Sequence, residues 1–148
     1  MIRVLSVVAL LVLAGCKEEE KGIGKPPASV PTKTVAAVDR TFAKLDASIA
    51  EASAAKRGKK AKEYCAHLAG KVVPKLRLAA AEAISHVPRK DTKIAADGAE
   101  WLARYISIEL SERGDRLREA VATCTDDPDV KKALTELAMA ALAAHAQR

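Results

Sequence analysis

One stretch of the chain, residues 34–56, predicts the fold most directly: TVAAVDRTFAKLDASIAEASAAK. Its apolar side chains recur at spacings of 3, 4, 3, 4 and 3 residues, at Val35, Val38, Phe42, Leu45, Ile49 and Ala52. This repeat is typical of a helix that buries one stripe of its surface against neighbouring helices. We therefore expect a helix here that belongs to a helical bundle.

A second helix is predicted over about residues 60–87. The side chains expected on its inward side are Cys65, Leu68, Val72, Leu76, Ala79, Ala80, Ala83 and Val87. Pro74 lies inside this stretch, and its ring would clash with the carbonyl group of Gly70 in a regular helix. We therefore expect a kink near Gly70–Pro74.

Two more helices follow in the sequence. Asp91 is expected to cap a third helix over about residues 92–122, in which the apolar pattern weakens enough to allow a break at Gly114. The fourth helix has a stronger start signal, because Asp127 precedes Pro128 at the first helical position. Its expected inward side chains are Val130, Leu134, Leu137 and Ala141.

The composition favours the same fold class. Thirty-one of the 148 residues are alanine, the strongest helix former, and only four are aromatic. Four helices joined by connections of two to six residues should pack as antiparallel neighbours. The sequence therefore predicts an all-α domain over residues 34–148, an up-down-up-down four-helix bundle with a thin core.

The N-terminus carries a targeting signal. A short positive start at Arg3 is followed by an apolar run over residues 4–13, which is too short to span a membrane. The run ends in Leu13-Ala14-Gly15-Cys16, which resembles the lipobox of bacterial lipoproteins. The resemblance implies that Cys16 receives a diacylglyceryl group, that residues 1–15 are removed as a signal peptide, and that the protein is tied to a membrane outside the cytoplasm. The alternative is an ordinary secretory leader.

Residues 16–33 are expected to form the lipidated end and a flexible linker. Glycines and prolines are interspersed among charged residues here, with no apolar period. Aspartate after the acylated cysteine is associated, through the same resemblance, with retention at the inner membrane in some bacteria. Lys17 at that position favours the outer membrane, if the source has one. The predicted location, from the lipobox resemblance, is the periplasmic face of the cell envelope.

The charge balance limits the partners. The formal net charge of +6 is too small for a nucleic-acid signature, but it favours contact with anionic lipids or acidic proteins. Five cations gather between the first two helices, at Lys56, Arg57, Lys59, Lys60 and Lys62. This run is either a solvated turn or a contact surface for an acidic envelope component or protein.

Two cysteines remain once Cys16 is assigned to lipid. In the predicted topology Cys65, near the start of the second helix, and Cys124, past the end of the third, lie at the same end of the bundle. A pair of cysteines in an exported chain is expected to be oxidised where geometry allows. We therefore expect a Cys65–Cys124 disulfide, the alternative being two buried thiols.

Histidine and glutamate pairs raise the question of a bound metal. Glu63/His67 and Glu82/His86 are separated by four residues on the second helix, and His145 lies near the end of the fourth. Such groups can hold a divalent ion, but Glu-x-x-His pairs and a Cys-x-x-Cys-His haem motif are absent. The simpler interpretation is surface stabilisation of the helices, and no cofactor is expected.

No catalytic motif is present in the sequence. The prediction is therefore a non-catalytic binding or scaffold domain on a membrane-anchored lipoprotein of the cell envelope, and not an enzyme. The alternative is a bundle that carries a metal or haem. The sequence does not determine the oligomeric state.

Overall fold

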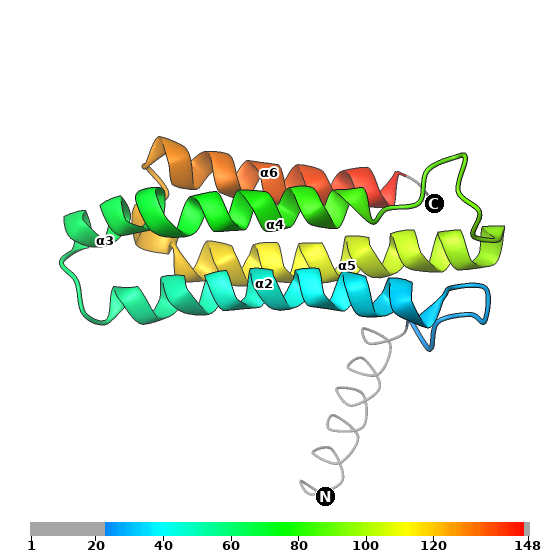
Figure 1. Cartoon of the computed structure of the whole chain (residues 1–148). Coiled ribbons are helices and arrows are strands. Elements are labelled where there is room, and N and C mark those ends of the chain that lie inside the picture. Colours follow the sequence, from blue (N-terminus) through cyan, green and yellow to red (C-terminus); the bar gives the residue numbers. More distant parts are fainter. Residues whose placement is uncertain (1–22, 147–148) are drawn as a thin grey trace, which may run out of the picture.

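The computed structural model describes residues 23–146 of the chain (Figure 1). The predicted signal peptide and the predicted lipidation site Cys16 lie outside these residues. The described part is helical and contains no strand. It therefore confirms the all-α class that the alanine-rich composition predicts. No helix within residues 23–146 combines the length and apolar character needed to cross a bilayer.

Four long helical stretches make up the fold, and the second has an internal π-helical turn. In chain order the elements are α2 (Thr32–Lys56), α3 (Ala61–His67), η1 (Leu68–Val72), α4 (Val73–Ser85), α5 (Ala96–Ala120), η2 (Ala122–Cys124) and α6 (Pro128–His145). Each long helix is amphipathic, so each must bury one side against the others.

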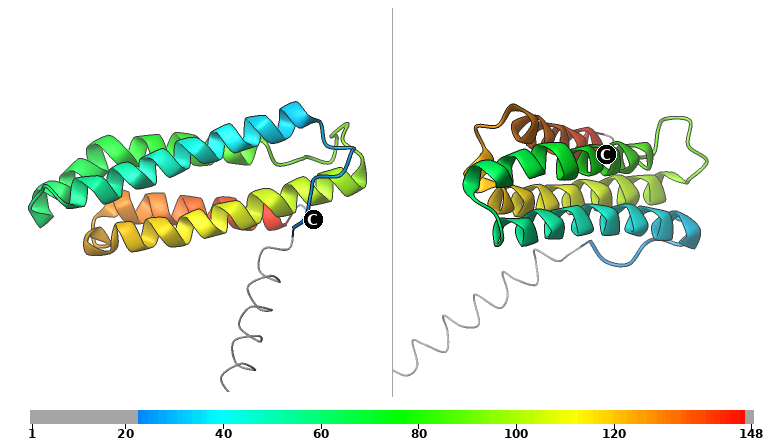
Figure 2. Two further views of the ribbon diagram at one scale, coloured as in Figure 1. Left: turned by 90° about the horizontal axis from the view of Figure 1, so that it is seen from below. Right: turned by 60° about the vertical axis from the view of Figure 1, so that its left-hand side comes forward.

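The helices pack in two layers. Figure 2 shows α2 and α4 side by side in one layer and α5 and α6 in the other. Contacts also join the layers, because α4 packs on α6 and α2 on α5, and the α5–α6 contact is the most extensive. The fully buried side chains at the centre of this arrangement include Val38, Leu45, Leu68, Val72, Leu102, Ile106, Leu110 and Leu117.

The long helices give the molecule two distinct ends. We call the end at which residues 23–31 lead into α2 the entry end, on the right in Figure 1. The connection between α4 and α5 also lies there. We call the opposite end, where α2 connects to α3 and where α6 begins, the far end. The run of cations at residues 56–62 and the two predicted disulfide cysteines lie at the far end.

The second helix accommodates its proline through a π-helical turn. Residues Leu68–Val72 are π-helical and end immediately before the turn that contains Pro74. The wider turn suits a position where proline supplies no backbone N–H group to the preceding carbonyl groups. Gly70 is exposed, and a Cβ atom there would meet nothing within 4 Å. The helix continues past Pro74 through a local change of helix type, and the kink expected near Gly70–Pro74 stays a prediction.

The start of α5 differs from the prediction. The helix begins at Ala96, so Asp91 does not cap it, and its N-cap residue Ala95 makes no side-chain capping hydrogen bond. The connection from Ser85 to Ala96 is therefore longer than the two to six residues expected. Ile94, which the sequence prediction placed in the third helix, instead packs against the core from this connection. The helix then runs without a break through Gly114 to Ala120.

Ordered contacts also begin earlier than expected at the N-terminal side. Helix α2 starts at Thr32 rather than residue 34, and Val30 before it is buried. The Ser29 hydroxyl donates a hydrogen bond of 2.9 Å to Asp97 Oδ1 on α5. The last residues of the expected linker are therefore packed against the fold.

The start of α6 is as predicted. Asp127 accepts hydrogen bonds from the backbone N–H groups of Asp129 and Val130, at 3.0 and 3.2 Å, and Pro128 occupies the first helical position. The side-chain cap satisfies two of the N–H groups that have no partner inside the helix.

Candidate functional site

The five cations singled out in the sequence lie in the connection between α2 and α3 and in the helix ends on either side of it. All are exposed, and within residues 23–146 none forms an ion pair with an acidic side chain: Lys56, Arg57, Lys59, Lys60 and Lys62. Lys56 ends α2, where a cation interacts favourably with the helix dipole. We call residues 56–62 the basic turn; it presents its charge to solvent.

Acidic residues lie at the same end of the molecule. Asp126 and Asp127 are in the connection between η2 and α6, and Asp129 is in the first turn of α6. Contacts between η2 and α3 hold this connection beside the second helix. The far end is therefore dipolar rather than uniformly positive.

An open groove continues from the basic turn between α2 and α5. Polar and charged side chains line much of it, among them Asp46, Ser53, Lys56, Arg57, Arg116 and Glu119. The lining contains both cations and carboxylates, and two of them, Asp46 and Arg116, are paired with each other. The groove extends the charged surface of the basic turn along the helices.

Cys65 and Cys124 are brought together as the topology predicts. Their sulfur atoms lie at disulfide distance and their Cα atoms are 5.4 Å apart, across a sequence separation of 59 residues. Cys124 is buried, and Cys65 is half-buried and packs against the core. The pair links the second helix to η2 at the far end.

Tyr64 reinforces the same end and was missed by the sequence reasoning. It is 1 % exposed, and its hydroxyl group lies 2.9 Å from the carbonyl oxygen of Ala52 and 3.0 Å from that of Ala120. Burial raises the pKa of Tyr64. The signal was available, since Tyr64 begins a repeat of four residues through Leu68, Val72 and Leu76.

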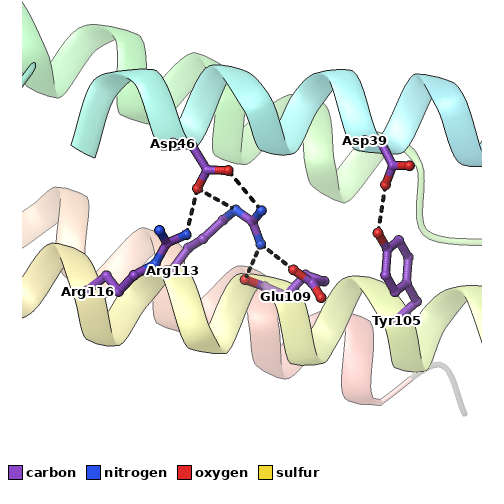
Figure 3. A network of polar contacts seen from close by, with 6 residues as sticks. All are labelled: Asp39, Asp46, Tyr105, Glu109, Arg113 and Arg116. Atoms are coloured by element: carbon purple, nitrogen blue, oxygen red, sulfur yellow. Dashed lines mark hydrogen bonds and ion pairs between the residues drawn. The ribbon is translucent and has the colours of Figure 1, made fainter. Parts of the chain in front are cut away.

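A polar network lies between α2 and α5 (Figure 3). Arg113 is almost buried, and its Nη2 donates a hydrogen bond of 3.0 Å to Asp46 Oδ2. Its Nη1 donates to both the carbonyl oxygen and the carboxylate of Glu109, at 3.1 and 2.5 Å. Arg116 donates to Asp46 at 2.6 Å, and the guanidinium of Arg113 lies 4.6 Å from the centroid of the Phe42 ring.

The network is compensated electrostatically. Burial by itself lowers the pKa of Arg113, but its bonds to Glu109 and Asp46 outweigh burial and raise that pKa. Tyr105, one turn before Glu109, donates a hydrogen bond of 2.6 Å to Asp39. Its pKa is raised, chiefly by burial and further by this bond. These mutual contacts join α2 to α5.

Sequence reasoning also missed Arg113, where it allowed a break in the helix. The signal was the spacing of Ile106, Leu110, Arg113 and Leu117 by 4, 3 and 4 residues, which places an arginine in an apolar seam. A buried arginine needs acidic partners. Those partners come from α2 and from the preceding turn of α5.

The histidine and glutamate candidates for a metal are not brought together. Glu82 forms an ion pair with Lys44 at 2.8 Å, and the hydrogen bond from Lys44 lowers its pKa. The Nε2 atom of His86 lies 3.2 Å from the buried hydroxyl group of Thr41. Glu63 is exposed, His67 is half-buried, and His145 is exposed in the last turn of α6. Within residues 23–146 no three histidine, cysteine or acidic side chains gather as metal ligands.

The helices leave little room between them for a cofactor. A void of about 10 Å³ lies between the second helix, α5 and α6, and only apolar side chains line it, such as Leu68, Leu76 and Leu117. That volume is comparable to one water-sized probe sphere. A haem or another organic cofactor does not fit into this void.

Comparison with known proteins yields no relative: no family model, curated protein or solved structure matches the chain.

Proposed function

We propose that this protein is an exported lipoprotein of the cell envelope, acylated at Cys16, with a non-catalytic domain that binds or scaffolds a partner. In this proposal the domain is an antiparallel, up-down-up-down four-helix bundle. The contacts of α2 with α4 and α5, and of α6 with the same two helices, support that arrangement. The lipobox-like stretch at residues 13–16 supports the anchor and the periplasmic face.

One observation carries the proposed role: the chain enters the fold at one end, and the basic turn lies at the other. Helix α2, with 25 residues, is roughly 37 Å long and separates the two ends. A bundle tethered by its N-terminal side would therefore hold the basic turn away from the bilayer. Exposed cations without acidic partners in the described residues suit an acidic envelope component or protein there.

The cysteine pair supports an address outside the cytoplasm. Disulfides persist in oxidising compartments and are rare in the cytosol. Cys65 and Cys124 are placed so that they can bond without backbone movement, because their Cα separation of 5.4 Å is ordinary for a disulfide.

The geometry favours a binding role over the metal or haem carrier. Glu82 and His86 are already engaged by Lys44 and Thr41. The central void is lined by apolar groups and is far smaller than an organic cofactor. The almost buried charge of Arg113 on α5 is paired with Asp46 on α2.

The anchor is tested by the intact mass of protein extracted from native membranes. We expect a chain that begins at Cys16 and carries fatty acyl chains, of which two or three give durable anchoring. A high-salt wash should release a Cys16→Ser variant from the membrane fraction but leave the acylated protein in place. Recovery of the uncut chain with an unmodified Cys16 would disprove the lipoprotein assignment.

The partner surface is tested by a photo-crosslinking residue at Gly58, where an added side chain meets nothing within 4 Å. We expect a discrete protein adduct in cells that disappears when Lys59, Lys60 and Lys62 are changed to glutamate. The matched control places the crosslinker at Leu142, which is 63 % exposed on α6. An adduct that forms equally well at Leu142, or that is indifferent to the charge change, would refute a binding role for the basic turn.

A further inference from the structure

We propose that the entry end of the molecule binds anionic lipid headgroups, so that the domain stands with this end against the bilayer that anchors it. The inference rests on the proposed lipid anchor for its location and adds a second, electrostatic contact. The contact surface is the entry-end cluster, which we define as Lys25, Lys33, Arg89, Lys90 and Lys93.

The cluster is assembled from two segments far apart in sequence. Lys25 belongs to the segment before α2, Lys33 to the first turn of α2, and the other three cations to the connection between α4 and α5. All five are exposed, and none forms an ion pair within residues 23–146. Lys33 also occupies a helix start, where the helix dipole disfavours a cation, so it adds nothing to the stability of α2.

The segments that connect the helices at the entry end hold few acids. Residues 23–31 and 86–95 carry four cations and one acid, a net charge of +3. Lys33 in the first turn of α2 adds a cation, and Asp97 in the first turn of α5 adds an acid. The scattered cations of the entry end therefore add up to an excess of positive charge.

Contacts between the two segments fix where the chain leaves the fold. Ser29 donates a hydrogen bond of 2.9 Å to Asp97, and Val30 is buried. Val30 and Ile94 both approach Gly98 so closely that a Cβ atom there would lie 3.0 and 2.9 Å from their methyl groups. The segment that leads back toward Cys16 therefore leaves from beside the connection between α4 and α5.

The length of the linker keeps this end near the membrane. Thirteen peptide bonds separate Cys16 from Ser29 in the sequence. The basic turn lies a further helix length away, roughly 37 Å along α2. An anchor at Cys16 therefore favours contact of the entry end, rather than the basic turn, with the headgroups.

The shape of the surface favours a lipid layer over a small anion. The grooves along the helices that are lined by Lys44 and by Arg77 contain no cation of the entry-end cluster. Exposed cations on two connecting segments match a plane of many negative charges. Near such a surface each cation contributes independently and is screened by salt, and the anchor supplies a high effective concentration.

The test uses residues 17–148, oxidised and without an acyl chain, mixed with vesicles of phosphatidylglycerol and phosphatidylcholine in equal parts. We expect sedimentation with these vesicles and not with phosphatidylcholine alone. Changing Arg89, Lys90 and Lys93 to glutamine should weaken binding roughly a hundredfold at low salt. The matched control changes Lys59, Lys60 and Lys62 to glutamine; it removes the same charge at the far end and should alter binding about twofold at most.

An equal loss of vesicle binding in the two variants would show that binding depends only on the net charge of the protein, and this would overturn the proposal. No binding to anionic vesicles would overturn it as well, and so would a larger loss from the far-end variant. Circular dichroism of both variants checks that the helices persist, as expected for exposed residues. Because the assay contains no acyl chain, its failure would leave the lipid anchor untouched, and loss of the anchor would be seen separately in the intact mass.

Discussion

The two ends of the molecule are closed in different ways. At the far end, Cys65 and Cys124 link the second helix to η2, and the buried Tyr64 bonds to carbonyl groups of two other helices. At the entry end, the contacts are noncovalent and include the Ser29–Asp97 hydrogen bond and the packing of Val30 and Ile94 against Gly98. Regions held by few noncovalent contacts open locally before regions held by many. The entry end should therefore be the more adaptable end, which suits a surface that settles on a membrane.

Removal of the cysteine pair should have the largest effect on this difference. Changing Cys65 and Cys124 to serine frees a loop of 59 residues, and we expect the free energy of unfolding to fall by up to about 4 kcal/mol. Hydrogen exchange should then become faster at the far end than at the entry end. The measurements are denaturant unfolding and hydrogen exchange of the wild-type protein, first oxidised and then after addition of reductant. The double variant is the control, because reductant should not affect it; equal stability of oxidised and reduced wild type would contradict the prediction.

The Gly98→Ala variant disturbs the other end. Its new methyl group would lie within about 3 Å of Ile94 and Val30, so we expect a loss of about 1–3 kcal/mol despite the better helix propensity of alanine. Gly114→Ala in the same helix is the matched control, since its methyl group meets Leu137 only at 3.9 Å. That variant should gain up to about 1 kcal/mol. A stable Gly98→Ala protein would show that the contact of the entry segment with α5 is loose in solution.

Tyr64→Phe tests how much of the far end depends on hydrogen bonding rather than on the cysteines. The change leaves the ring in place but removes the donor to the carbonyl groups of Ala52 and Ala120. We expect a loss of about 1–2 kcal/mol in thermal or denaturant unfolding. The loss should persist in the cysteine-free background. If it vanished there, the tyrosine would act only through the disulfide.

The smallest expected effect is the loss of stability at alkaline pH that comes from Tyr64 and Tyr105. The pKa values of Tyr64 and Tyr105 are raised above their ordinary value of about 10, so the protonated form is favoured in the folded state. Stability from this source is present below pH 10 and is lost as the pH rises above it, because the unfolded chain then releases these protons more readily. Tyr105→Phe should flatten the decline more than Tyr64→Phe, since Asp39 adds to the effect at Tyr105. The measurement is the melting temperature of both variants across about pH 9 to 12. An equally steep decline of melting temperature with pH in the two variants would contradict the prediction.

The candidate site was predictable in part. The basic turn could be predicted because its five cations are close in sequence. An exposed side chain needs no partner from a distant part of the chain. The entry-end cluster was less visible, since Lys25 lies more than sixty residues before Arg89. The charge that compensates the basic turn was equally hidden. It comes from Asp126 and Asp127, which reach the same end only through the path of the helices.

Local chemistry determined the helices themselves. Apolar side chains at 3- and 4-residue spacing placed α2, and Asp127 followed by Pro128 placed the start of α6, because a stripe and a cap act within one or two turns. Counting helix directions also brought Cys65 and Cys124 to one end. These features depend on neighbours in sequence or on the order of elements alone.

Only the tertiary structure decided where α5 begins, how Arg113 is compensated and where the chain leaves the fold. Asp91 had the chemistry of a cap, but the helix begins only at Ala96, after Ile94, which packs against the core from the connection. Arg113 meets Asp46 across 67 residues, and Ser29 meets Asp97 across 68. The reason is physical: caps and stripes are set by contacts within one helix, whereas a buried charge or a docked segment is stabilised only once another helix supplies its partner.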